Sequence, residues 1–185
     1  MTEERVPDPR LLVFREVLPG DVRKQRAESN DSATGGGARD LRFRHGDEMS
    51  PILTRMFPSP ADEEGVTRGN VCWVDSDRRV QTAEIEFWRP TDARPNEVRL
   101  GCIYNVLSWN VDDAAYQESQ RNGQRWFYYL VLDGRGRVWA RLFRQEHLAN
   151  ENPLVRDYVR QRIADTPGNR AIFGSIDLIT GETCP

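Results

Sequence analysis

A glycine-rich polar segment between residues 24 and 44 carries the side chains with the clearest chemical potential in this chain. Its short hydroxyl, amide and carboxyl side chains are Ser29, Asn30, Asp31, Ser32 and Thr34. Three glycines at 35–37 follow, and because glycine has no Cβ, a ligand can approach the backbone closely there. Consecutive N–H groups of such a loop can converge on an anion. The segment is therefore a candidate anion-binding or nucleic acid-binding loop, with a solvated surface loop as the alternative.

Cations flank this segment on both sides. They are Lys24, Arg26, Arg39, Arg42 and Arg44. The guanidinium fork of arginine matches phosphate oxygens and the guanine edge. Lys24 is the only lysine in the chain, so the flanking charge is mostly arginine.

The order Ser-Asn-Asp…Thr-Gly-Gly after basic residues resembles the amino-terminal effector-binding domain of EcoRII-type restriction endonucleases. The matching residues are Ser29, Asn30, Asp31, Thr34, Gly35 and Gly36. The resemblance implies a DNA-binding pseudobarrel in which two arms grip the duplex and read its major groove. Here Asp and Thr are one residue closer than usual, and Gly37-Ala38 replaces the family's His-Gln. The second arm corresponds loosely to residues 97–100 followed by Tyr104-Asn105.

This resemblance implies a module that binds double-stranded DNA without cutting it. Lys24, Arg26 and Arg39 would contact phosphates, while Gly35 and Gly36 would permit close backbone approach. The residues expected to meet base edges or shape the arms are Ser29, Asn30, Asp31, Thr34, Arg99, Tyr104 and Asn105. Because His-Gln is replaced, the preferred DNA sequence need not follow the family. Such a module would serve a bacterial restriction or phage-defence system beside a separate nuclease or defence protein.

Two alternatives belong to other classes. A diverged metal-dependent nuclease would use Glu84 and Glu86, which alternate along one expected strand, but the usual catalytic lysine near such acids is absent. A barrel that binds proteins or small ligands and has lost DNA binding is favoured by the net charge of −3. His45 and His147 lack zinc-site spacing, so neither a catalytic site, a metal nor a cofactor is expected.

Composition indicates one globular domain over residues 1–185, with residues 1–10 frayed. Hydrophobic residues make up 38% of the chain, and no apolar run reaches the length of a membrane span. The first ten residues lack the apolar segment of a secretory signal. Three cysteines without a CxxC pair are typical of a reduced protein. We therefore expect a cytoplasmic protein with no membrane partner.

Charge is unevenly distributed along the chain. The span 120–144 contains six arginines and Asp133 as its only acid, which could create a positive face. Within it, Arg137, Trp139, Arg141 and Phe143 alternate on one strand face. They could stack on bases and bind phosphates. The favoured interpretation is that the aromatic rings pack inward while the arginines pair with carboxylates.

Period-two patterns and turn signals predict mostly β structure. Strands are expected at 11–17, 40–44, 71–74, 80–88, 99–106, 126–132, 137–143 and 171–178. Residues 45–69 are expected to be mostly loop with a short helix at 51–56, and another short helix is expected within 110–120. The main helix should follow the N-cap Asn152 and bury Leu154, Val155, Tyr158, Val159 and Ile163. We therefore predict one pseudobarrel of seven or more short strands with one or two peripheral helices.

Overall fold

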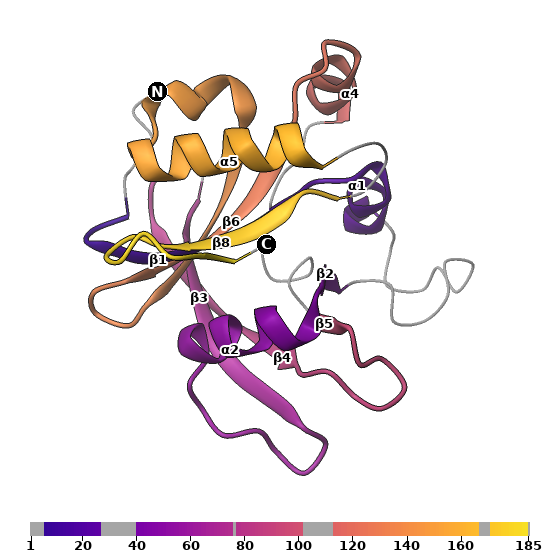
Figure 1. Ribbon diagram of the computed structural model, residues 1–185, viewed down its shortest axis with the longest axis vertical. Coiled ribbons are helices and arrows are strands. Elements are labelled where there is room, and N and C mark those ends of the chain that lie inside the picture. Colours follow the sequence, from indigo (N-terminus) through magenta and orange to yellow (C-terminus); the bar gives the residue numbers. More distant parts are fainter. Residues whose placement is uncertain (1–5, 27–39, 76, 102–112, 167–170, 185) are drawn as a thin grey trace.

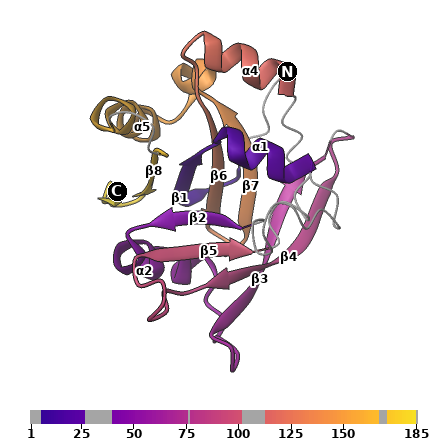
Figure 2. The ribbon, with the colours of Figure 1, turned by 90° about the vertical axis from the view of Figure 1, so that its right-hand side faces the viewer.

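The computed structural model describes residues 6–26, 40–75, 77–101, 113–166 and 171–184. Nine strands form one sheet that curls into a half-barrel (Figures 1 and 2). Their bounds are β1 (Pro9–Glu16), β2 (Leu41–Arg44), β3 (Val66–Val74), β4 (Val80–Trp88), β5 (Glu97–Gly101), β6 (Trp126–Asp133), β7 (Val138–Arg144), β8 (Phe173–Asp177) and β9 (Thr183–Cys184). Their order is β2-β5-β4-β3-β7-β6-β1-β8-β9, with only the described β3–β7 pair parallel. The mostly β, barrel-like fold class is confirmed.

Short helices cover parts of this sheet. They are α1 (Pro19–Arg26), α2 (Gly46–Met56), α4 (Asp113–Arg121), α5 (Pro153–Asp165) and the 3-10 helix η2 (Gln145–Asn150). Among the described residues, none of these helices is long and apolar enough to cross a membrane.

The predicted strands at 80–88, 126–132 and 137–143 are confirmed, but three local predictions were wrong. Residues 19–26 form α1, so the segment predicted as a loop from residue 24 begins inside a helix. Helix α2 begins at Gly46, because Met49, Leu53 and Met56 form a buried helical stripe that extends it before Pro51. Strand β3 begins at Val66 inside the expected loop, paired along its whole length with β4.

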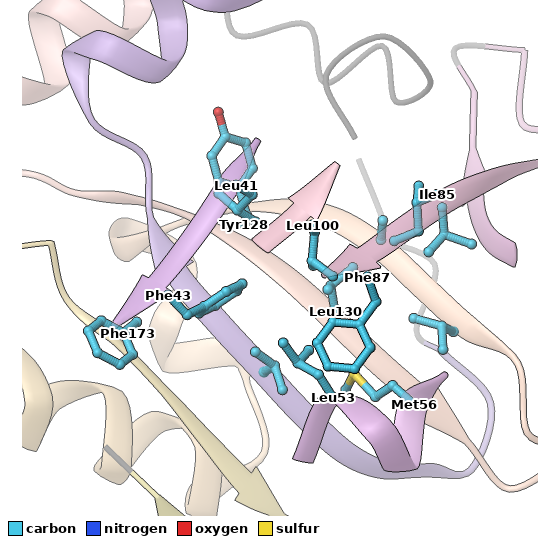
Figure 3. Packing of buried hydrophobic residues seen from close by; sticks show 14 of the residues in the cluster. Leu41, Phe43, Leu53, Met56, Ile85, Phe87, Leu100, Tyr128, Leu130 and Phe173 are labelled. Carbon is cyan, nitrogen blue, oxygen red and sulfur yellow. The ribbon is translucent and has the colours of Figure 1, made fainter. Parts of the chain in front are cut away.

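Two hydrophobic cores lie on opposite sides of the sheet. The inner core fills the half-barrel and includes Phe43, Leu53, Phe87 and Leu100 (Figure 3). The outer core lies under α5, whose Val155 and Val159 are buried; Figure 1 shows this helix running across β6 and β8.

Helix α5 has a narrower buried stripe than the sequence predicted. Leu154 is 47% exposed, contrary to prediction, while Tyr158 and Ile163 are half-buried. The predicted N-cap is confirmed, because Leu154 N donates to Asn152 Oδ1 at 2.9 Å. This cap sets the start of α5, and the start places Val155 rather than Leu154 toward the sheet.

Helix α2 links the two ends of the curled sheet. It packs on β2 and β5 near one end, and its Arg55 reaches Asp177, the last residue of β8, at 2.7 Å. The Asp177 carboxylate also accepts hydrogen bonds from the backbone N–H groups of Ile179 and Thr180. The hydrogen bond from Arg55, followed by the backbone hydrogen bonds, lowers the pKa of Asp177 to about 2.

Replacing Asp177 with Asn is expected to lower the free energy of unfolding by about 1 to 2 kcal/mol at pH 7. Because the folded pKa of Asp177 is depressed, its stabilisation is complete above the unfolded pKa of about 3.9 and is lost as pH falls toward 2. The difference between Asp177→Asn and the parent should therefore shrink between these pH values. Urea denaturation at several pH values measures it.

Asp157→Asn is the matched control, because Asp157 pairs with Arg156 at 2.8 Å on the exposed side of α5. Exposed pairs contribute little to stability, so this variant should unfold like the parent. An Asp177→Asn protein as stable as the parent at pH 7 would show that the ion pair does not secure the ends of the sheet.

Candidate nucleic acid interface

Most of the residues predicted to contact DNA lie outside the described residues. They are Ser29, Asn30, Asp31, Thr34, Gly35, Gly36, Arg39, Tyr104 and Asn105. Lys24 and Arg26 belong to the last turn of α1, which leads into residues 27–39. Arg99 lies on β5, and its side chain contacts Asp40.

Residues 97–100, predicted to begin the second arm, instead form strand β5, with Val98 and Leu100 fully buried in the inner core. The register of β2 and β5 places the start of β2 beside the end of this strand. These strands are antiparallel, with Leu41 opposite Leu100 and Arg42 opposite Arg99. Asp40 follows residues 27–39 directly, and Gly101 precedes residues 102–112 directly. Arg99 Nη1 donates to Asp40 Oδ2 at 3.2 Å, which joins the two attachment points. Two segments about 60 residues apart in sequence therefore leave the same end of one strand pair.

Arg99 is held from a second side by an aromatic ring. Its guanidinium lies over the Trp88 ring, 4.9 Å from the centroid, and its side chain is only 21% exposed. The indole Nε1 of Trp88 donates to Glu86 Oε2 at 3.2 Å. A Cβ on Gly101 would come within 3.1 Å of both of these atoms. The absence of a side chain at Gly101 therefore lets the tryptophan and glutamate cover the end of β5.

The outward face of β2 and β5 carries more arginine than carboxylate. Strand alternation puts Arg42 and Arg44 on the face opposite the buried Leu41 and Phe43, as the sequence pattern predicted. Glu97 lies opposite Arg44.

The Glu97 carboxylate serves two arginines at once. Its Oε1 lies 3.7 Å from Arg42 Nε and 3.5 Å from Arg94 Nη1. Arg44 is exposed and forms no ion pair within the described part of the chain. Around this strand pair, four arginines, Arg42, Arg44, Arg94 and Arg99, stand beside three carboxylates, those of Asp40, Glu97 and Glu86. Glu86 also lies 3.8 Å from Arg68. Arginine therefore outnumbers carboxylate by one among these side chains.

A shallow hollow of about 660 Å³ lies at the other end of the same strand pair. It is lined by Arg44, His45, Arg94, Pro95, Asn96 and Glu97. Gly46 holds the loop against α2, since a Cβ there would meet Pro90 Cγ and Pro95 O at 2.9 Å. Guanidinium, imidazole and amide donors around one hollow are suited to anionic oxygens.

Sequence reasoning missed His45, Trp88, Arg94 and Asn96 as members of this surface. The loop between β4 and β5 gave no local signal, because its position beside β2 depends on the β2–β5 pairing. Arg42 and Arg44 were noted as flanking cations, and the alternation in residues 40–44 could have placed them on the outward face.

The second arginine-rich region is largely neutralised. Its carboxylate partners are Glu16 for Arg125, Asp133 for Arg137, Glu151 for Arg141 and Glu146 for Arg144. Trp139 and Phe143 are buried beside them. The favoured interpretation of this hairpin is confirmed: its rings pack inward and its arginines pair with acids.

The acids considered for a nuclease have other contacts. Glu86 accepts from Trp88 and lies 3.8 Å from Arg68, whereas Glu84 is exposed. Within the described ranges, no three His, Cys, Asp or Glu side chains gather in a way that could hold a metal ion.

Comparison with protein-family models gives no match, and neither curated proteins nor solved structures match significantly.

The contact between Arg99 and Trp88 should be measurable as a coupling energy. A double-mutant cycle with Arg99→Gln and Trp88→Leu is expected to give a coupling of about 0.5 to 1 kcal/mol in the free energy of unfolding. The physical reason is the attraction of the guanidinium to the indole face. Urea denaturation of the four proteins measures it.

The control cycle pairs Trp88→Leu with Arg44→Gln, because Arg44 lies opposite Glu97 and not beside the indole. Its coupling should be close to zero. Equal coupling in both cycles would mean that the Arg99–Trp88 contact is not specific.

Proposed function

We propose that this chain is a module that binds duplex DNA through the outward face of β2 and β5 and the two segments attached to it. The observation that carries this proposal is the β2–β5 register, which places Asp40, directly after residues 27–39, at the same end of the strand pair as Gly101, directly before residues 102–112. The first of these segments holds the Ser-Asn-Asp…Thr-Gly-Gly pattern. A second segment attached at the same end of the strand pair, which contains Tyr104 and Asn105, agrees with a two-armed grip on a duplex.

The size and charge of this surface support the proposal. Four residues of strand span about 13 Å, close to the roughly 12 Å width of the major groove. The arm attachment points lie at one end of this span and the arginine-lined hollow at the other. A local excess of arginine can bind phosphates even though the whole chain carries a net charge of −3.

Within this proposal, the polar groups of the first arm read bases or shape the arm. Asn30 is suited to an adenine edge, and Asp31 can accept from the amino group of cytosine. Lys24, Arg26 and Arg39 contact phosphates, which fix the register of the protein on the duplex. Arg99 acts from the base of the arms, where Asp40 and Trp88 hold it.

The biological setting follows from the resemblance. A DNA-binding module of this kind would act in the cytoplasm of a bacterium, in restriction or phage defence, through a separate nuclease or as a sensor. Cys72 and Cys184 are free thiols, which fits a reducing compartment.

Charge removal in the arm should weaken binding to every DNA sequence. Alanine at Lys24, Arg26 or Arg39 is expected to flatten the slope of log affinity against log salt by roughly one unit, since one fewer counterion is released. Asn30→Ala and Asp31→Ala should instead cost about 1 to 3 kcal/mol on the preferred site and little on random DNA. Selection from a randomised duplex pool identifies that site, and calorimetry at two salt concentrations measures the affinities.

Arg160→Ala is the matched control, because Arg160 is exposed on α5 and outside the proposed surface. It should bind DNA like the parent. Parent-like binding by both Arg39→Ala and Asn30→Ala would end the arm hypothesis, and a parent protein without salt-sensitive binding would end the proposed function.

The purified protein is not expected to cleave DNA with Mg²⁺ or Mn²⁺. Glu86 is engaged by Trp88 and Arg68, and the chain has no lysine beside Glu84 and Glu86. Incubation with supercoiled plasmid tests this, with metal-free buffer as the control. Cleavage that disappears in Glu84→Gln or Glu86→Gln protein would establish the nuclease alternative.

A further inference from the structure

A second concave site lies away from the proposed DNA surface. It is a cavity of about 520 Å³ between β1, β6, β7 and the start of α5, elements that take no part in that surface. Its floor is apolar, formed by Leu12, Val131 and Val155 of the outer core, each at most 3% exposed. The volume falls in the range of about 300 to 1,000 Å³ that is typical of small-molecule pockets.

One wall of the cavity presents a charged pair that is already balanced. Arg141 Nη2 donates to Glu151 Oε1, and these side chains are 20% and 15% exposed. The guanidinium also lies over the rings of Tyr129 and Phe143, at 5.4 and 5.5 Å from their centroids. Because the two charges cancel, an ionic ligand would have to break this pair to gain a partner.

The same wall keeps hydrogen-bonding capacity. Arg141 lines the cavity and has five N–H donors, one of which meets Glu151 Oε1. A ligand acceptor at this wall can therefore bind a guanidinium N–H. Beside it, the carboxylate of Glu151 has lone pairs left to receive a ligand N–H.

The wall is also fixed before any ligand arrives. Asn152 caps α5 through Leu154 N, and Pro153 occupies the first helical position. These features hold residues 150–153 at the rim of the cavity without a bound partner. A preformed wall costs less conformational entropy on binding.

We infer that this cavity binds a small neutral ring that carries an amide edge, with a carbonyl toward Arg141 and an N–H toward Glu151. The apolar body of the ring would rest on Leu12, Val131 and Val155. Pyrimidine bases and cyclic lactams share this chemistry. The inference is independent of DNA binding by the β2–β5 surface.

Titration of the ¹⁵N-labelled protein with thymine and with δ-valerolactam tests the inference. At least one ring is expected to bind with a dissociation constant of about 1 mM or tighter and to shift the backbone amide signals of residues 150–152, 154 and 155. A preference for thymine or for the lactam identifies which source of the amide edge the cavity takes. Cyclohexanecarboxylate and cyclohexylammonium, which match the ring but carry charge, should bind more weakly.

Two variants locate the binding. Glu151→Gln removes the charged acceptor and should weaken binding about tenfold. Leu178→Trp adds bulk at a half-buried lining position and should abolish binding while keeping the Arg141–Glu151 pair. Arg144→Gln is the matched control, since Arg144 pairs with Glu146 outside the cavity on the same strand, and it should bind like the parent.

Three outcomes would overturn the inference. They are no binding of either ring by the parent at about 10 mM, parent-like binding by Leu178→Trp, and tighter binding of the carboxylate than of the neutral rings. The last outcome would identify an anion site instead.

Discussion

Two-sided burial of the central strands is the constraint on which the rest of this structure depends. In β1, Val13 faces the inner core and Phe14 the outer core, and both are fully buried; Tyr128 and Phe127 of β6 repeat the arrangement. Each face of the sheet centre must therefore be covered by apolar groups. Helix α5 covers one face. The other is covered by curling of the sheet and by α2, which Arg55 ties to Asp177.

This arrangement leaves the outward face of β2 and β5 without a covering helix among the described elements. Helix α5 packs on β8 and on Phe14 of β1, and the curl carries β2 and β5 away from it (Figure 2). Their inward residues complete the inner core, while Arg42, Arg44, Glu97 and Arg99 remain on the outward face. The polar surface proposed for DNA is thus a consequence of how the core is enclosed.

Local patterns in the sequence predicted the strands well, because successive strand residues alternate between the buried and the exposed face of the sheet. Asp40 to Arg44 shows this directly, with Leu41 and Phe43 inward. Helix α2 was predicted too short, because Met49 gains its burial from strands distant in sequence. The Asp40–Arg99 pair spans 59 residues and no local signal identifies it. The resemblance pointed to the first arm, but the residues that carry it lie outside those described.

The carboxylates on the proposed surface are compatible with nucleic acid binding, because they orient neighbouring arginines. A guanidinium has five N–H donors, and Arg99 uses one of them on Asp40 while its face rests on Trp88. The remaining donors keep a fixed direction, so less side-chain entropy is lost when they meet a ligand. Glu97 restrains Arg42 and Arg94 with one negative charge, so the net charge of these three side chains is positive. An acidic chain can in this way present a small, preorganised basic surface whose selectivity depends on geometry more than on total charge.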